Sequence, residues 1–144
     1  MRNPHGQNYN HWISMKINAI DFIVTQVSDV QKSIPFYRDI LGLSIEDFNQ
    51  EADWAEFSIG TNTLALCGPN AQAWGVPHQI PTQTGTTIAL AVENIDEALE
   101  ELRRRNVPIL TDKKDSTVCY FAIISDPDGN CIWLHQGYAD YHKK

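Results

Sequence analysis

Three side chains near the end of this 144-residue chain could take part in chemistry, and they alternate along one apolar run: Cys131, Trp133 and His135. Alternate residues of a β-strand point to the same face, so a strand here would present all three together. An indole offers a flat apolar surface, and an imidazole could transfer a proton to a substrate within hydrogen-bond reach. A lone histidine on a strand is more often structural, and an inward cysteine more often acts as a small apolar residue.

Two carboxylates are the other candidates for acid–base work. Glu56 shares a face of a predicted strand with Trp54, and Asp21 lies within another apolar run, 17–27. Strand parity also predicts that Cys67 and His135 both lie on the inner faces of their sheets. His135, Glu56 and Asp21 are therefore the candidates for a general acid or base.

The elements that position these residues form a repeated pattern. The first copy consists of a strand (17–27), a helix (29–41) and three strands (43–49, 54–59, 62–67). The second copy has a strand at 87–92, a helix capped by Asn94 with Glu97 three residues on, and strands at 107–111, 118–124 and 131–134. Lys113 to Asp115 is predicted as a turn, and 126–130 (DPDGN) as a hairpin turn. The copies overlay at a separation of 65 residues, which indicates a duplicated α+β module.

Proline disturbs the first helix. Pro35 lacks an N–H and clashes with the preceding helical turn, so either the helix is kinked there or Ser33 is its N-cap. Gly42 is suited to end the helix in a left-handed conformation.

The chain resembles the vicinal oxygen chelate superfamily, which includes glyoxalase I, bleomycin resistance proteins and extradiol dioxygenases. The segments that carry the resemblance are VSDVQKSIPFYRDILGL (27–43), AVENIDEALEEL (91–102) and DPDGNCIWL (126–134). It implies two tandem βαβββ modules whose curved mixed sheets surround a cavity, and often a homodimer. The single domain would span 15–144, with module one at 17–67, a connector at 68–84 and module two at 85–137.

Metal enzymes of this superfamily usually place His, Glu or Gln ligands on the first and last strand of each module. These four positions fall on Phe22, Ala65, Thr87 and Trp133, and none of these side chains is a usual metal ligand. The sequence therefore predicts no metal and no cofactor. Phe22 and Trp133 would form an aromatic cavity floor, or would simply fill the former site as core, and Ala65 and Thr87 would leave room.

The connector and the ends of the chain carry further expectations. The Pro- and Gly-containing loop 68–84 holds Trp74 and His78, and Trp74 either fills a surface gap or lies over a pocket. Residues 1–14 are predicted to be a flexible leader, with Met1 or Met15 as the true start.

The net charge of −7 argues against nucleic acid as a partner, and no apolar run is long enough to span a membrane. Three scattered cysteines favour a reducing cytoplasm.

These observations predict a metal-independent protein that binds an aromatic or hydrophobic small molecule. The resemblance implies that it forms a homodimer. The predicted ligand-binding side chains share strand faces or the connector: Phe22, Trp54, Ala65, Cys67, Trp74, Thr87, Trp133 and His135. Two alternatives stay open. One is a metal-independent lyase or isomerase that uses His135, Glu56 or Asp21. The other is a glyoxalase-like or dioxygenase-like metal enzyme with displaced ligands such as His78 and His135.

Overall fold

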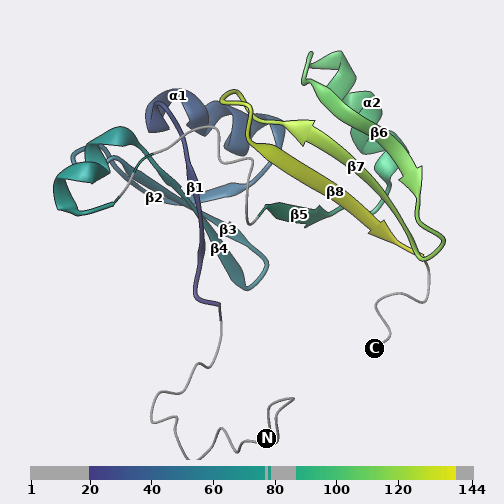
Figure 1. The fold of residues 1–144 in the computed structure, drawn as a ribbon, viewed down its shortest axis with the longest axis horizontal. Coiled ribbons are helices and arrows are strands. Elements are labelled where there is room, and N and C mark those ends of the chain that lie inside the picture. Colours follow the sequence, from purple (N-terminus) through teal and green to yellow (C-terminus); the bar gives the residue numbers. More distant parts are fainter. Residues whose placement is uncertain (1–19, 77, 79–86, 139–144) are drawn as a thin grey trace, which may run out of the picture.

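The computed structural model describes residues 20–76, 78 and 87–138 (Figure 1). The predicted leader and parts of the connector lie outside these ranges. The first half contains β1 (Ile23–Gln26), α1 (Val30–Pro35), the π-helical segment η2 (Phe36–Ile40), β2 (Ser44–Asn49), β3 (Trp54–Ile59) and β4 (Asn62–Cys67). The second half contains the 3₁₀ helix η3 (Pro69–Trp74), β5 (Ile88–Ala91), α2 (Ile95–Arg104), β6 (Ile109–Asp115), β7 (Cys119–Ser125) and β8 (Cys131–Gly137).

The strands form two mixed sheets of the same design. Their orders are β1-β4-β3-β2 and β5-β8-β7-β6, with the first and last strand of each module paired in parallel. Ile23 and Ile88, which begin β1 and β5, are 65 residues apart, as are the helix N-caps Asp29 and Asn94. This is the predicted pair of βαβββ modules, and Figure 1 shows the two sheets side by side with a helix on each.

The first helix begins at Asp29 rather than at Ser33. The Asp29 carboxylate accepts a hydrogen bond from the Lys32 N–H at 3.0 Å, whereas Ser33 is buried inside the helix. Pro35 ends the regular α-helical turn, and the chain continues as the wider π-helical segment η2. The proline therefore changes the helix type, because it cannot supply the N–H that the α-helical pattern needs.

The predicted turn at Lys113 to Asp115 is wrong. These residues belong to β6, and the chain turns just afterwards, where Thr117 has a φ of 75°. The strand β6 lies at the edge of its sheet, and its charged side chains are exposed. Charged residues are common on edge strands because they discourage further strand pairing.

One core joins the two modules. Phe57 and Leu66 from the first sheet belong to the same buried cluster as Ile95, Leu99 and Ile124 from the second module. All five side chains are at most 2% exposed. Burial on this scale contributes roughly 1.5–3 kcal/mol for each large apolar side chain. In the described ranges, no helix is long and apolar enough to cross a membrane.

A buried carboxylate ties the modules together at the β7–β8 turn. Asp126 accepts hydrogen bonds from the Tyr37 hydroxyl of η2 at 2.8 Å and from the side chain and the backbone of Asn130 at 2.9 and 2.7 Å. Asn130 also donates to the Gln26 carbonyl at 3.0 Å. The turn therefore holds module two against the end of β1 and against η2 through polar contacts that are almost entirely desolvated.

We expect the protein to lose stability above about pH 10, in part because of Tyr37. Burial, and next the nearby Asp126 charge, raise the pKa of Tyr37 above its ordinary value of 10.0. Below pH 10 the folded and unfolded chains both keep this proton, but above it the unfolded chain ionises first. The free energy of unfolding should then fall by up to about 1.4 kcal/mol per pH unit. Urea unfolding between pH 8 and 11 measures the slope, and a Tyr37→Phe variant with an equally steep slope would contradict this assignment.

Gly68, directly after β4, has no room for a side chain. A Cβ at this position would lie 2.3 Å from the Asp53 carboxylate, which accepts a hydrogen bond from the Asn70 N–H at 2.9 Å. We expect Gly68→Ala to displace that carboxylate and to lower the free energy of unfolding by about 1 kcal/mol. Chemical denaturation tests this. In an Asp53→Gly background the same substitution should cost little, and an undiminished cost there would show that the clash is not the cause.

Candidate functional site

Each sheet has one face packed on the shared core and one face that α1 and α2 leave uncovered. In the first sheet the core face carries Phe57, Leu64 and Leu66, which are buried. Trp54, Glu56 and their alternating neighbours therefore lie on the other face. In the second sheet Ile132 and Leu134 pack on the core, so Trp133 and His135 belong to the uncovered face.

The uncovered face of the first sheet presents two aromatic rings and a carboxylate. Phe22 is half exposed and meets Trp54 edge to face, with ring centroids 6.0 Å apart and an angle of 85° between the planes. The Trp54 indole N–H donates to Glu56 Oε1 at 3.0 Å. This bond orients the indole and engages one oxygen of Glu56. The three residues together make a partly apolar surface with one hydrogen-bond acceptor.

Ala65 and Cys67 lie deeper on the same sheet and are fully buried. In the strand register Ala65 stands between Val24 and Glu56, and Cys67 is paired with Trp54. Burial, followed by the charge of Asp53, raises the pKa of the Cys67 thiol. Because the thiolate is the nucleophilic form, a raised pKa favours a structural role for Cys67 over a chemical one.

The uncovered face of the second sheet carries a stacked aromatic pair. The rings of Trp133 and Phe121 have centroids 5.1 Å apart and planes 26° apart. His135 is the cross-strand partner of Phe121, and Cys131 begins the same strand. All four residues are partly exposed. Within the described residues, no ring contact joins this pair to Phe22 and Trp54, so the aromatic residues form one cluster on each sheet.

Thr87 lies where the two sheets approach each other. It is exposed, and it lines a cavity of about 70 Å³ together with Val24 and Cys131. Small-molecule pockets usually enclose about 300–1,000 Å³. This cavity is therefore too small for a drug-sized ligand.

The remaining candidates stand apart from these faces. Asp21 is exposed just before β1, and the Trp74 side chain lies outside the described residues. His78 is partly buried, and its Nε2 contacts the Val27 carbonyl at 2.9 Å, which places the donor N–H on that nitrogen. The connector residue His78 thus binds the end of β1.

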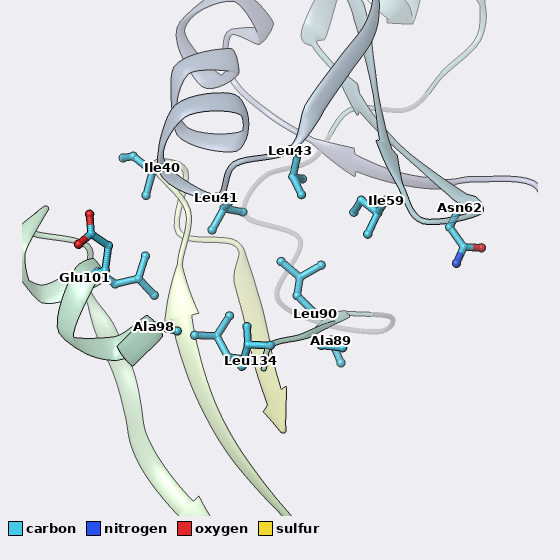
Figure 2. Close-up of a pocket in the computed structure, with 13 residues that line it drawn as sticks. Ile40, Leu41, Leu43, Ile59, Asn62, Ala89, Leu90, Ala98, Glu101 and Leu134 are labelled. Carbon is cyan, nitrogen blue, oxygen red and sulfur yellow. The ribbon is translucent and has the colours of Figure 1, made fainter. Parts of the chain in front are cut away.

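The sequence analysis missed two features, the aromatic residue Phe121 and a cavity between the modules. Phe121 alternates with buried Ala122 and Ile124, so strand parity could have placed it beside Trp133. A cavity of about 420 Å³ between the modules left no such signal, because its walls come from segments far apart in the chain. Figure 2 shows Ile40, Ile59, Leu90 and Ala98 around this space. None of the predicted ligand-binding residues whose side chains the structure describes lines it.

The side chains present do not fit the metal ion of the superfamily's enzymes. The four implied positions hold a phenyl ring, a methyl group, a hydroxyl and an indole, and divalent ions need several N, O or S donors in close geometry. Within residues 20–76, 78 and 87–138, no group of three or more His, Cys, Asp or Glu side chains could hold a metal ion.

Comparisons with known proteins agree with this architecture. A family model described as Glyoxalase/Bleomycin resistance protein/Dioxygenase superfamily matches residues 19–134. A metallothiol transferase FosB of Staphylococcus epidermidis is 32% identical over 129 residues, covering 85% of this chain and 84% of the relative. A lactoylglutathione lyase of Salmonella typhimurium is 29% identical over 117 residues, covering 76% and 85% of the two chains.

Solved structures show the same fold. A glyoxalase/bleomycin resistance protein/dioxygenase from Nocardioides has a TM-score of 0.70 and 19% identity, covering 91% of each chain. TnmS3, an antibiotic binding protein from Streptomyces sp. CB03234, has a TM-score of 0.69 and 23% identity, covering 86% of this chain and 99% of its own. At these identities the likeness concerns the fold alone.

Proposed function

The chain belongs to the glyoxalase/bleomycin resistance protein/dioxygenase superfamily, and from that membership we propose that it binds a planar aromatic or otherwise apolar small molecule without a metal ion. One observation carries the proposal: positions that hold metal ligands in the superfamily's enzymes hold Phe22 and Trp133 here, and both rings are partly exposed beside another aromatic ring.

The chemistry of the two aromatic clusters favours a flat ligand. A planar molecule can stack on the Trp133 indole, and such aromatic contacts contribute roughly 0.5–1.5 kcal/mol beyond the burial of area. Glu56 and His135 lie on the same uncovered faces and supply polar groups that could fix the ligand's orientation. The fold is compatible with this role, since TnmS3 has the same fold and is an antibiotic binding protein.

We further propose that the binding form is a homodimer. Strand β1 lies at one edge of its sheet, and Phe22, just before it, and Val24, within it, are 50% and 41% exposed. An unpaired edge beside exposed apolar side chains favours association with another chain. Light scattering coupled to size-exclusion chromatography measures the mass, and a strict monomer at 100 μM would rule out this part of the proposal.

Two measurements on the purified full-length chain test the metal-free binding. Elemental analysis should find no stoichiometric Zn, Ni, Mn or Fe before treatment with a chelator. Calorimetric titration with 2-naphthol, an uncharged planar probe, should show saturable binding that the chelator does not change. A chelator-sensitive metal at one equivalent would overturn the proposal, and so would the absence of binding by 2-naphthol and by a panel of larger planar compounds.

An enzymatic function is the second candidate, and the relatives favour it. Proteins that are 32% and 29% identical to this chain are a transferase and a lyase. Without a metal, Glu56 and His135 would transfer the protons. Asp21, which is exposed just before β1, is the third candidate. With displaced metal ligands, His78 and His135 would be the first residues to test. The elemental analysis above separates the metal enzyme from the other two functions.

A further inference from the structure

The 420 Å³ cavity lies at the seam between the two modules, away from the aromatic clusters. Ile40 and Leu41 approach from the end of η2, and Ile59 from the β3–β4 hairpin. Leu90 of β5 and Ala98 of α2 complete the opposite side, as Figure 2 shows. Side chains from both modules thus converge on one space, and junctions between structural units are a preferred location for small-molecule sites.

The lining is aliphatic. Besides Asn62 and Glu101, every described residue that lines the cavity is Ile, Leu, Val or Ala, and none of them is aromatic. Seven of the apolar side chains that line it are only partly buried although they pack against the core: Ile40, Leu41, Leu43, Ile59, Leu90, Val92 and Ala98. Contiguous half-exposed apolar side chains mark an interaction site, and such a lining does not hold water well.

Glu101 is the one charged residue in the described part of the lining, and it is paired. The Glu101 carboxylate forms ion pairs with Arg105 Nε at 2.9 Å and with the Arg104 guanidinium at 2.6 Å. These arginines lower the pKa of Glu101, so the carboxylate is ionised and already neutralised by its partners. A charged ligand would gain little there and would lose its hydration on entering the aliphatic space.

We propose that this cavity is a second binding site, and that it takes an uncharged aliphatic or alicyclic molecule. Its volume lies within the range of roughly 300–1,000 Å³ that small-molecule pockets occupy. The site differs from the aromatic clusters in its location, in its lining and in the shape of its ligand. It is independent of the function proposed above, because no residue of the aromatic clusters lines it.

A titration of the methyl-labelled full-length chain with cyclohexanol tests the site by nuclear magnetic resonance. The methyl signals of Leu90, Leu134 and Ile59 should shift in a saturable way, whereas those of exposed Val118 should not. Ala98→Leu adds volume inside the cavity and should weaken cyclohexanol binding at least about tenfold. Ala73→Leu, the same change on the exposed side of η3, should change the affinity less than about twofold.

Two further variants distinguish the cavity from the aromatic clusters. If Ala98→Leu fails to fold, Ile59→Trp fills the cavity from the opposite module and should have the same effect. Phe22→Ala, which removes an aromatic cluster residue, should leave cyclohexanol binding intact even if 2-naphthol binding fails. The proposal is overturned if cyclohexanol produces no saturable shift or if the filling variants bind as well as the parent chain. It is also overturned if dilution alone changes the same methyl signals, because a second copy would then cover the cavity.

Discussion

Asp126→Ala should lower the free energy of unfolding by about 4 kcal/mol, the largest effect we expect from a single polar substitution in this chain. The carboxylate is 3% exposed and accepts bonds from the Tyr37 hydroxyl, the Asn130 side chain and two backbone N–H groups. Each hydrogen bond to a charged group contributes roughly 1.5–3 kcal/mol, and donors left buried without an acceptor add a desolvation cost. The substitution also removes the buried bond between Tyr37 of the first module and the β7–β8 turn of the second.

Urea unfolding followed by circular dichroism measures the effect of Asp126→Ala. Asp112→Ala is the matched control, because Asp112 is also a carboxylate bonded to another element, through Arg103, but both partners are solvent-exposed. Exposed ion pairs contribute about 0–1 kcal/mol. If the two variants lose similar amounts of stability, the buried turn does not hold the modules together as described.

Trp133→Ala should weaken the binding of 2-naphthol by about thirtyfold. Truncating an aromatic residue at the centre of a binding site typically costs about 2 kcal/mol, which corresponds to this factor. Phe121 would remain, but it would lose the stacked indole 5.1 Å away, so the platform for the ligand would shrink to one ring. Isothermal calorimetry measures the change directly.

A comparison with Trp12→Ala controls for the loss of a tryptophan as such, since Trp12 belongs to the predicted leader. This variant should bind 2-naphthol as the parent chain does. Thermal unfolding of Trp133→Ala shows whether the fold persists. An intact fold with unchanged affinity would remove Trp133 from the binding site and leave only a packing role for it.

The sequence was most informative where local chemistry and the repeat agree. Asn94 is the N-cap of α2 as predicted and accepts a hydrogen bond from the Glu97 N–H at 3.1 Å. The 65-residue separation correctly relates β1 to β5. Local chemistry misled at Lys113, whose charged surroundings suggest a turn, because the strand β6 has solvent on its outer edge and tolerates charges there.

The site was less accessible to sequence reasoning. Strand parity groups Trp54 with Glu56 and Trp133 with His135, but it contains no information on which residues of one sheet approach those of the other. The seam cavity is the clearest case, since Ile40 and Leu90 belong to segments with separate periodic patterns. Only the packing of α2 and η2 around the common core brings such side chains to one space.

The polar link at the β7–β8 turn also has a consequence for the order of events during synthesis. The Ser28 N–H donates to Asp128 and the Tyr37 hydroxyl to Asp126, residues that the ribosome adds 100 and 89 positions later. Until those residues are made, the Ser28 N–H and the Tyr37 hydroxyl lack these two acceptors. Domains generally begin to fold from the N-terminus as they emerge. We therefore expect the polar contacts of the first module to be completed only after the β7–β8 turn has been synthesised.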